Sequence, residues 1–545
     1  MKQLISTPMK VILAAVTASL AMLFSGCGQG VPDADEGAAN GILLHGNGAE
    51  PKTLDPQRAT GVTENKIISA LLEGLIAYHI DDDNLPEPGV AESWEMNENA
   101  SVWTFKLRED SYWSNGDPVT AGDFIYTYKR MLDPAFTGEY AQMLFLIRNA
   151  EAYKAGEITD FSEVGLVAES DKVLRIELVG PTPYFLSMLK HYSWFPVHPP
   201  TIEAHGGPFE MSGTWTYPEN FVGNGPFVLT DWRPNQYIRV TKSPTYWDRD
   251  TMKLNEIYFY PVEDDNTEKR MFDSGLLHVT NTVPTNDVPV LRETKPDIIH
   301  IDDYLGTYFF RLNVTRPPLD NPLVRKALNF AIDRQAIVDR VTLADEKPTY
   351  AYVPAGFNGY PSPMTLGYDP EKARALLAEA GYPNGDGFPE LYLLFNTSEG
   401  HRKIAEAVVA MWNKNLGINM QLENKEWKVY LDAQTLLDYD VSRSGWIGDY
   451  MDPITFLEMF TTGNGNNDTG WSNARYDELI AKGFKSNTEE EHFASLLEAE
   501  KILLEELPLV PIYWYTRVYQ MDPRVQNWHP KLLDNRPYKY IYFSE

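Results

Sequence analysis

Cysteine is almost absent from this sequence of 545 residues. Cys27 is its single cysteine, so the chain can form no internal disulfide and no metal site of paired cysteines. A chain of this length buries cores large enough to be stable without a disulfide. Its stability is therefore expected to come from packing.

Long apolar runs are also scarce. Residues 11–24 form one clear run, which is shorter than the roughly 20 residues that a membrane-spanning helix needs. Two lysines precede it, and the small residues Ser25 and Gly26 follow it, an order typical of a secretion signal. We expect residues 1–26 to be a signal peptide and the mature chain to be exported.

Positive charge is in deficit. The 47 lysines and arginines stand against 77 aspartates and glutamates, which gives a formal net charge of −30 at pH 7. Because such a surface repels phosphate groups, we expect no nucleic-acid partner. The hydrophobic content of 43% argues against a disordered chain.

The common catalytic motifs are missing too. The sequence has no Gly-x-Ser-x-Gly elbow, no His-Glu-x-x-His helix and no phosphate-binding loop. Its ten histidines are scattered, without a second ligand at close helical spacing. We therefore expect no enzyme activity, no metal and no cofactor. A secreted hydrolase that acts on peptides or glycans stays open as an alternative, although it would need a nucleophile, a metal or a poised pair of carboxylates.

Strand and helix patterns alternate along the rest of the chain. Residues 102–107 alternate between apolar and polar, as in a half-buried strand, and turn residues follow at 114–118. Ile404, Val408, Met411 and Trp412 share one helical face, with Gly417 as a stop signal before a strand at 418–422. This mixture predicts the α/β class. Residues 31–41 show no apolar period, so a flexible tether is expected over residues 27–40.

Several blocks closely resemble one protein family in order and spacing. Residues 90–94, 103–108 and 113–124 are similar to the signature of the oligopeptide-binding branch of the family 5 extracellular solute-binding proteins, and later blocks also match. The resemblance runs from about residue 41 to the C-terminus. Trp94, Trp103 and Trp113, which belong to these blocks, are expected in the core rather than at a ligand.

The resemblance implies a hinged, two-lobed α/β fold of the cluster C type with an additional domain. Domain I is expected to combine three segments of the chain, domain II to be continuous, and domain III to form the second lobe of the cleft. The expected boundaries are 41–72, 199–305 and 515–545 for domain I, 73–198 for domain II and 306–514 for domain III.

The segment 443–450 is the best candidate for the ligand site. Gly445 and Gly448 permit close backbone approach, so an extended peptide could pair with this segment as an added strand. Asp449 would then meet the α-ammonium of the peptide. Asp452 precedes Pro453 and fits the cap of the helix that follows, which leaves Asp449 free.

Further contacts are implied by the resemblance alone. The matched positions are Tyr140, His401, Trp427, Arg443 and Trp446, and we add Gly445 and Ile447 from the candidate strand. His401 and Arg443 stand where the family meets peptide carboxylates. Thr60, Thr342 and Gln434 depart from the family pattern, in which glutamate, lysine and arginine occur, so the preferred peptide length stays open.

The family implies a monomeric receptor that delivers short peptides to an ABC permease. Residues 23–27 resemble a bacterial lipobox, although Phe24 departs from it, and Cys27 would then carry a lipid anchor at the periplasmic or outer side of a membrane. A receptor of the same fold for nickel, haem, an oligosaccharide or a murein peptide is the main alternative.

A substitution at Cys27 tests the anchor. Cys27→Ser should move the protein from the membrane fraction to the soluble fraction without changing its melting temperature, because the acylated residue is expected to lie outside the folded core. Fractionation of cells that express either form measures this. A wild-type protein found wholly in the soluble fraction would refute the anchor.

Overall fold

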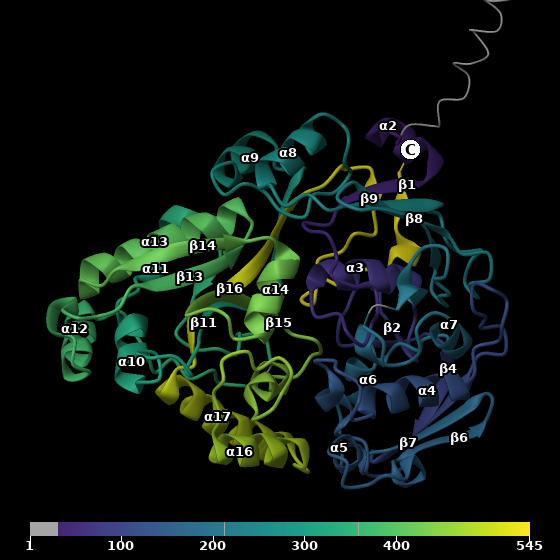
Figure 1. The fold of residues 1–545 in the computed structure, drawn as a ribbon. Helices are drawn as coiled ribbons and strands as arrows, with labels where there is room; N and C mark the ends of the chain where they lie inside the picture. The colour runs from purple at the N-terminus through teal and green to yellow at the C-terminus, as the bar shows by residue number, and fades with distance from the viewer. Residues whose placement is uncertain (1–30, 212, 358, 545) are drawn as a thin grey trace, which may run out of the picture.

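The computed structural model describes residues 31–211, 213–357 and 359–544. The expected signal peptide and Cys27 lie outside these residues. The chain forms two lobes that stand side by side in Figure 1. We call residues 31–305 and 515–544 the first lobe and residues 306–514 the second lobe.

The first lobe holds two four-stranded sheets. One has the order β1-β10-β9-β8, in which β1 pairs in parallel with β10 although about 200 residues separate them; the other has the order β4-β5-β7-β6 and is antiparallel. The strands are β1 (Ile42–Gly46), β8 (Phe227–Arg233), β9 (Tyr237–Lys242), β10 (Glu256–Tyr260), β4 (Ala91–Met96), β5 (Val102–Leu107), β6 (Leu166–Ser170) and β7 (Val173–Glu177).

The second lobe is built on a six-stranded mixed sheet. Its order is β12-β16-β11-β15-β13-β14, and the strands are β11 (Ile299–Leu312), β12 (Lys347–Pro348), β13 (Leu391–Asn396), β14 (Met420–Lys425), β15 (Val441–Ile447) and β16 (Leu509–Gln520). The remaining strands form two small antiparallel ladders in the first lobe: β2 (Ile76–Tyr78) pairs with β3 (Pro86–Pro88), and β17 (Val525–Gln526) pairs with β18 (Tyr542–Phe543).

Helices surround the sheets of both lobes, as Figure 1 shows. In the first lobe they are α2 (Ala34–Asn40), α3 (Val62–Leu71), α4 (Ala121–Leu132), α5 (Ala150–Lys154), α6 (Phe185–Met188), α7 (Pro199–Ala204), α8 (Asp265–Asp273) and α9 (Val288–Thr294). In the second lobe they are α10 (Pro322–Phe330), α11 (Arg334–Ile337), α12 (Pro370–Glu379), α13 (Glu399–Leu416), α14 (Trp427–Thr435), α15 (Ile454–Leu457), α16 (Ala474–Phe484) and α17 (Glu489–Glu506).

Two long strands connect the lobes. β11 and β16 pair on both sides of a register shift between Asp303 and Thr307, so their ladder runs through both lobes but is interrupted where the lobes meet. A β-bulge bends a strand locally. The expected domain boundaries at 305/306 and 514/515 fall at this interruption, and they stay predictions.

The sequence patterns predicted several elements correctly. Residues 102–107 form β5, and the predicted helix is α13, whose core face includes Ile404, Val408 and Trp412. Gly417 ends it in the left-handed conformation at φ 72°. The strand expected from residue 418 begins two residues later, as β14.

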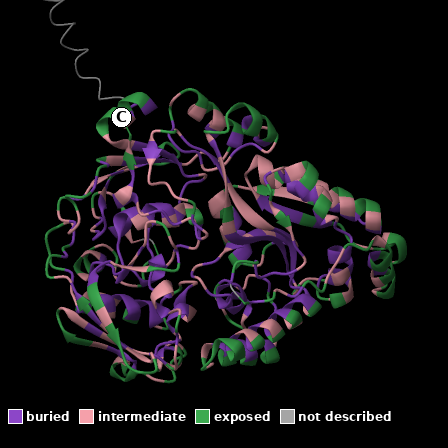
Figure 2. Cartoon of the chain, turned by 180° about the vertical axis from the view of Figure 1, so that it is seen from behind, coloured by how far each residue is buried: buried purple, intermediate pink, exposed green. Residues whose placement is uncertain are grey.

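Large aromatic side chains fill the interior of both lobes. Trp103 and Trp113 are buried, and Trp94 packs against the same core, as the sequence predicted. Figure 2 shows buried residues gathered inside the two lobes and exposed residues on the outer helices. None of the helices in the described residues is both long enough and apolar enough to cross a bilayer.

The expectation of a flexible tether is wrong from residue 34 onward. Residues 34–40 form α2, which begins with Asp33 accepting a hydrogen bond from the N–H of Glu36 at 2.9 Å and ends at Gly41 with φ 68°. The backbone of Ala34 binds Gly275 and His278 of the same lobe. The helix is held by backbone hydrogen bonds and by the small buried residues Ala34 and Gly37, so it needs no periodic apolar side chains and the sequence pattern does not reveal it.

Truncation of Trp412 should destabilise the second lobe. Its side chain is fully buried in the core on the six-stranded sheet, and Nε1 donates to the carbonyl of Leu328 at 2.9 Å. Trp412→Ala leaves a cavity and an unpaired carbonyl, so we expect a loss of about 3–5 kcal/mol in the free energy of unfolding, measured by urea titration. Lys414→Ala, at an exposed position of the same helix, should change it by less than about 0.5 kcal/mol.

Candidate ligand-binding site

A cavity of about 350 Å³ lies between the lobes. The first lobe contributes α3 and the loop before it, the connection from β10 to α8 and residues 533–538, while the second lobe contributes β15 and the start of α13. All eight residues that the sequence suggested as ligand contacts line this cavity: Tyr140, His401, Trp427, Arg443, Gly445, Trp446, Ile447 and Asp449.

The three positions that depart from the family pattern do not share one environment. Thr60 lines the cavity. Thr342 and Gln434 are buried and bonded to other parts of the protein, outside the described lining residues: the hydroxyl of Thr342 donates to Glu346 at 2.7 Å, and the amide of Gln434 donates to Ser442 at 3.0 Å. Neither side chain is therefore placed to contact a ligand in this conformation.

Strand β15 presents alternate residues to the cavity. Arg443, Gly445, Ile447 and, after the strand ends, Asp449 are partly exposed, and the residues between them are buried. One side of β15 pairs with β11 along its length, whereas β13 reaches only its first two residues on the other side. The backbone of residues 443–447 on that side has no strand beside it among the described residues.

Asp449 holds a carboxylate in the cavity wall without a charged partner. Its N–H donates to Thr455 at 3.0 Å, which fixes the turn after β15. Oδ2 is buried and has no hydrogen-bond partner, and burial raises the pKa of this carboxyl well above its usual range, with repulsion from Glu458 adding to the effect. Asp452 accepts from the N–H of Ile454 at 2.9 Å, but α15 begins one residue later than predicted, with Pro453 rather than Asp452 at its N-cap.

His191 lies beside Asp449 but does not neutralise it. Its Nε2 is 3.4 Å from Oδ1 of Asp449. Burial lowers the pKa of His191 to about 3, so the imidazole carries no charge at neutral pH. The ring of Tyr140 lies 4.8 Å from that of His191 and completes this end of the wall.

Arg443 carries a positive charge in the same wall, and its guanidinium has no carboxylate partner among the described residues. It donates to Oδ1 of Asn396 at 3.2 Å and to the hydroxyl of Tyr515 at 2.8 Å, and its Nε is buried without a partner. Its carbon Cζ lies 5.0 Å from the ring centre of Tyr308. His401 is 5.7 Å from the same ring, and burial, with the charge of Arg443, lowers the pKa of His401 well below its usual range.

Close packing within the protein explains why positions 445 and 448 are glycines. A Cβ on Gly445 would lie 2.5 Å from the hydroxyl of Tyr515, and one on Gly448 would lie 3.2 Å from the side chain of Leu305. Gly445 and Gly448 were expected to admit a ligand backbone, but here the space beside each Cα is filled by the protein. Trp446 is likewise held by the fold, because its Nε1 donates to the carbonyl of Thr455 at 2.8 Å.

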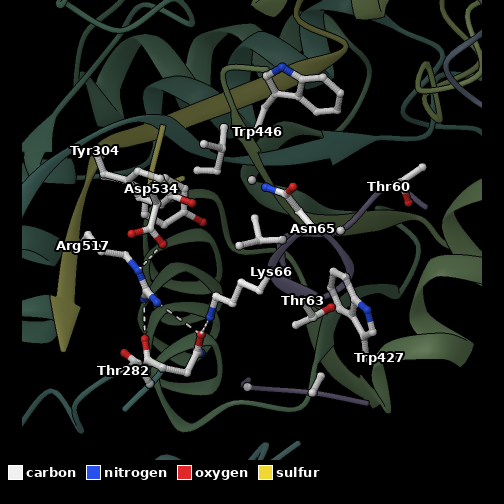
Figure 3. A pocket seen from close by; sticks show the side chains of 18 of the residues that line it. Thr60, Thr63, Asn65, Lys66, Thr282, Tyr304, Trp427, Trp446, Arg517 and Asp534 are labelled. Atoms are coloured by element: carbon white, nitrogen blue, oxygen red, sulfur yellow. Dashed lines mark hydrogen bonds and ion pairs between the residues drawn. The ribbon is translucent and has the colours of Figure 1, made fainter. Parts of the chain in front are cut away.

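A basic cluster of the first lobe was not predicted. Lys66 donates to Asn281 at 2.7 Å, and Arg517 binds Asp534 at 2.8 Å. Figure 3 shows Lys66, Arg517 and Asp534 on one side of the cavity, across from Trp427 and Thr60. Three distant segments supply these residues, and the one hint in the sequence is that Lys66 directly precedes the mostly apolar residues 67–72.

The comparisons with known proteins match almost the whole chain. The bacterial extracellular solute-binding proteins, family 5, match residues 86–468. The chain belongs to this family. The oligopeptide-binding protein OppA of Bacillus subtilis is 36% identical, over 88% of this chain and 88% of its own length.

Solved structures of the family share the two-lobed fold. The crystal structure of Haemophilus influenzae OppA in complex with the peptide RPPGFSPFR is 32% identical and superposes with a TM-score of 0.88, over 93% of this chain and 99% of that one. The Escherichia coli murein tripeptide-binding protein MppA is 33% identical with a TM-score of 0.87, over 92% and 98%. The unliganded open form of MppA gives 0.61 over 93% and 98%, so the lobes of this chain are arranged differently from that open form.

Removal of the Asp449 charge should stabilise the protein without ligand. A raised carboxyl pKa means that the folded state binds a proton more tightly than the unfolded chain, so stability falls as the pH rises from about 4 through the folded-state pKa. We expect Asp449→Asn to gain about 1–3 kcal/mol at pH 7 and little at pH 4. Urea titrations at both values measure this. Asp110→Asn, an exposed site, is the control, and an equal gain at both pH values would contradict the argument.

Proposed function

We propose that this protein captures short peptides in the cavity between its lobes and delivers them to an ABC permease. One observation carries the proposal. Asp449 and Arg443 hold opposite charges in one cavity wall, and neither has an oppositely charged partner within the described residues. A free peptide carries an ammonium at one end and a carboxylate at the other, so it can compensate both charges.

The open side of β15 supports the choice of a peptide. An extended peptide can form main-chain hydrogen bonds with residues 443–447, where β13 no longer covers the strand. These bonds read the length and direction of the ligand rather than its side chains. The relatives named oligopeptide-binding proteins, and the peptide complex of one of them, agree with this choice.

Closure of the lobes would bury the bound peptide. β11 and β16 are interrupted at the same level, between Asp303 and Thr307, and we infer that the lobes bend there. A ligand stabilises the closed form through the contacts that it makes in that form alone. The low TM-score against the open form of MppA supports a closed arrangement for this chain.

The remaining parts of the proposal concern location and assembly. The protein would be exported, held at the periplasmic or outer side of a membrane by a lipid on Cys27, and monomeric. His401 and Arg443 would meet the peptide carboxylate, Trp427 and Tyr140 would line side-chain space, and Asp449 would bind the ammonium.

Other ligands of the same fold are less well supported. Nickel needs several nitrogen, sulfur or carboxylate donors, and residues 31–211, 213–357 and 359–544 contain no group of three such side chains. An oligosaccharide offers no ammonium for Asp449. A murein peptide keeps both charged ends and stays the principal alternative, together with a wider choice of peptides.

A double-mutant cycle tests the ammonium contact. Acetylation of a peptide's N-terminus should weaken binding to the wild type by about 2–5 kcal/mol, because it leaves Asp449 buried and unpaired. Asp449→Asn should weaken binding of the free-amine peptide similarly. Since both changes remove one interaction, acetylation should cost the variant far less than it costs the wild type. Isothermal titration calorimetry measures the four affinities.

Asp110→Asn is a suitable control in this cycle, because its exposed side chain lies outside the lining of the cavity. It should show the full acetylation penalty of the wild type. Equal penalties in the wild type and Asp449→Asn would show that another group holds the amine.

A further inference from the structure

The turn that follows β15 is held against residues 184–193 of the first lobe. The N–H of Met451 donates to the hydroxyl of Ser187 at 3.1 Å, and the ring of Tyr184 stacks on that of Tyr450 with the centroids 5.8 Å apart. Met451 and Tyr450 belong to the second lobe, so both contacts cross between the lobes. The turn that carries the candidate ammonium site is thus braced by the opposite lobe.

The same segment places His191 against Asp449. Nε2 of His191 lies 3.4 Å from Oδ1 of Asp449, and the two side chains are only 5% and 12% exposed. Within the part of the chain that the structure describes, His191 is the one basic side chain in contact with this carboxylate. The other oxygen, Oδ2, has no hydrogen-bond partner. One oxygen therefore faces the first lobe, and the other is left without a donor.

Part of the environment of His191 is explained by the backbone alone. The histidine is the N-cap of the short 3-10 helix Tyr192–Trp194, and its Nδ1 accepts from the N–H of Ser193 at 3.3 Å. A cap uses one nitrogen of the ring. It does not account for the other, Nε2, which lies beside a carboxylate of the second lobe.

The cap also decides which nitrogen carries the proton. Burial lowers the pKa of His191 to about 3, so the ring is neutral and has a single N–H. The hydroxyl of Ser193 could take either role, because it lies 2.8 Å from Nδ1 and also 3.2 Å from the sulfur of Met143. The backbone N–H can only donate, so Nδ1 is the acceptor and Nε2 keeps the proton.

Aromatic rings keep the imidazole in place. The ring centroid of Tyr192 lies 4.0 Å from that of His191, and the centroid of Tyr140 lies 4.8 Å from it. All three side chains are buried. A hydrogen bond by Tyr140 also reaches the carboxylate of Asp449 and opposes part of the rise in its pKa. These two donors to the carboxylate are both neutral, and both come from the first lobe.

A neutral donor suits this place better than a cation. A positively charged side chain beside Asp449 would satisfy the carboxylate and compete with a ligand ammonium. An imidazole N–H orients the carboxylate but leaves its negative charge for the ligand. Orientation matters because a hydrogen bond to a charged group is strong only in good geometry.

We propose that His191 is a positioning residue of the ammonium site, which holds Oδ1 of Asp449 through its Nε2–H and so presents Oδ2 to the ligand. The donor belongs to the first lobe, so closure completes the site. The distance of 3.4 Å is longer than that of an ordinary N–H···O bond, about 2.7–3.2 Å, and it should shorten when a ligand fixes the carboxylate. This inference rests on the proposed peptide function and adds a residue of the opposite lobe to its ammonium contact.

Calorimetry with trialanine and N-acetyl-trialanine tests this role. His191→Leu keeps a similar volume but has no donor, so it should weaken trialanine binding at least about tenfold, the size expected for a contact to a charged group. N-acetyl-trialanine should bind this variant within about twofold of the wild type, because it has no ammonium. A purely structural role would weaken both peptides equally.

His191→Gln is the rescue variant. The side-chain amide of glutamine can place an N–H near the position of Nε2, so trialanine should bind it within about threefold of the wild type. His205→Leu changes a histidine outside the lining of the cavity and should leave both affinities unchanged. Unchanged melting temperatures show that the variants are folded.

The position of the proton can be measured directly. Long-range proton–nitrogen NMR spectra of protein labelled at histidine, with the His191 signals assigned from His191→Gln, should show the proton on Nε2. The Nε2 signal should shift when trialanine is added, and less when N-acetyl-trialanine is added. A proton on Nδ1 overturns the inference even if His191→Leu fails to fold.

The outcomes separate this inference from the proposed function. If His191→Leu binds trialanine as tightly as the wild type, or loses affinity for both peptides by the same factor, the positioning role is overturned and peptide capture stands. If the wild type binds both peptides equally, the ammonium contact fails and the inference with it. If neither peptide binds the wild type, the proposed function fails as well.

Discussion

The buried carboxylate of Asp449 is the constraint on which the rest of the site depends. A carboxylate that has lost its water and gained no cation destabilises the fold that holds it, and neutral His191 does not relieve that cost. The turn after β15 that carries this carboxylate is fixed by the hydrogen bonds to Thr455 and Asp452. In the proposed function, binding of a ligand ammonium would offset this cost and so favour the closed form.

Both lobes contribute charged residues to the cavity. The second lobe supplies Arg443 on β15 and Asp449 just after it, and the first lobe supplies Lys66 and Arg517. Neither lobe alone surrounds a ligand. The strands β11 and β16 run through both lobes, and their shared interruption lies where the lobes meet.

Much of the fold, and the side of the cavity formed by the second lobe, could be predicted from the sequence. Strand β5 and helix α13 follow from local patterns, and Asp449 emerged because the pattern assigned Asp452 to the helix end. Helix α2 was missed because backbone bonds and Gly37, rather than apolar side chains, fix it. Lys66 and Arg517 were missed because distant segments of the chain bring them together, and no local pattern in the sequence indicates that contact.

The contact between Gly445 and Tyr515 bears on how substitutions in this family should be interpreted. Tyr515 comes from β16, one of the strands shared by both lobes, and its hydroxyl occupies the space beside Gly445 while also accepting from Arg443. A side chain at position 445 would displace this tyrosine and, through it, the guanidinium. Glycine at position 445 is thus required by the packing of the protein itself, whichever ligand the cavity binds.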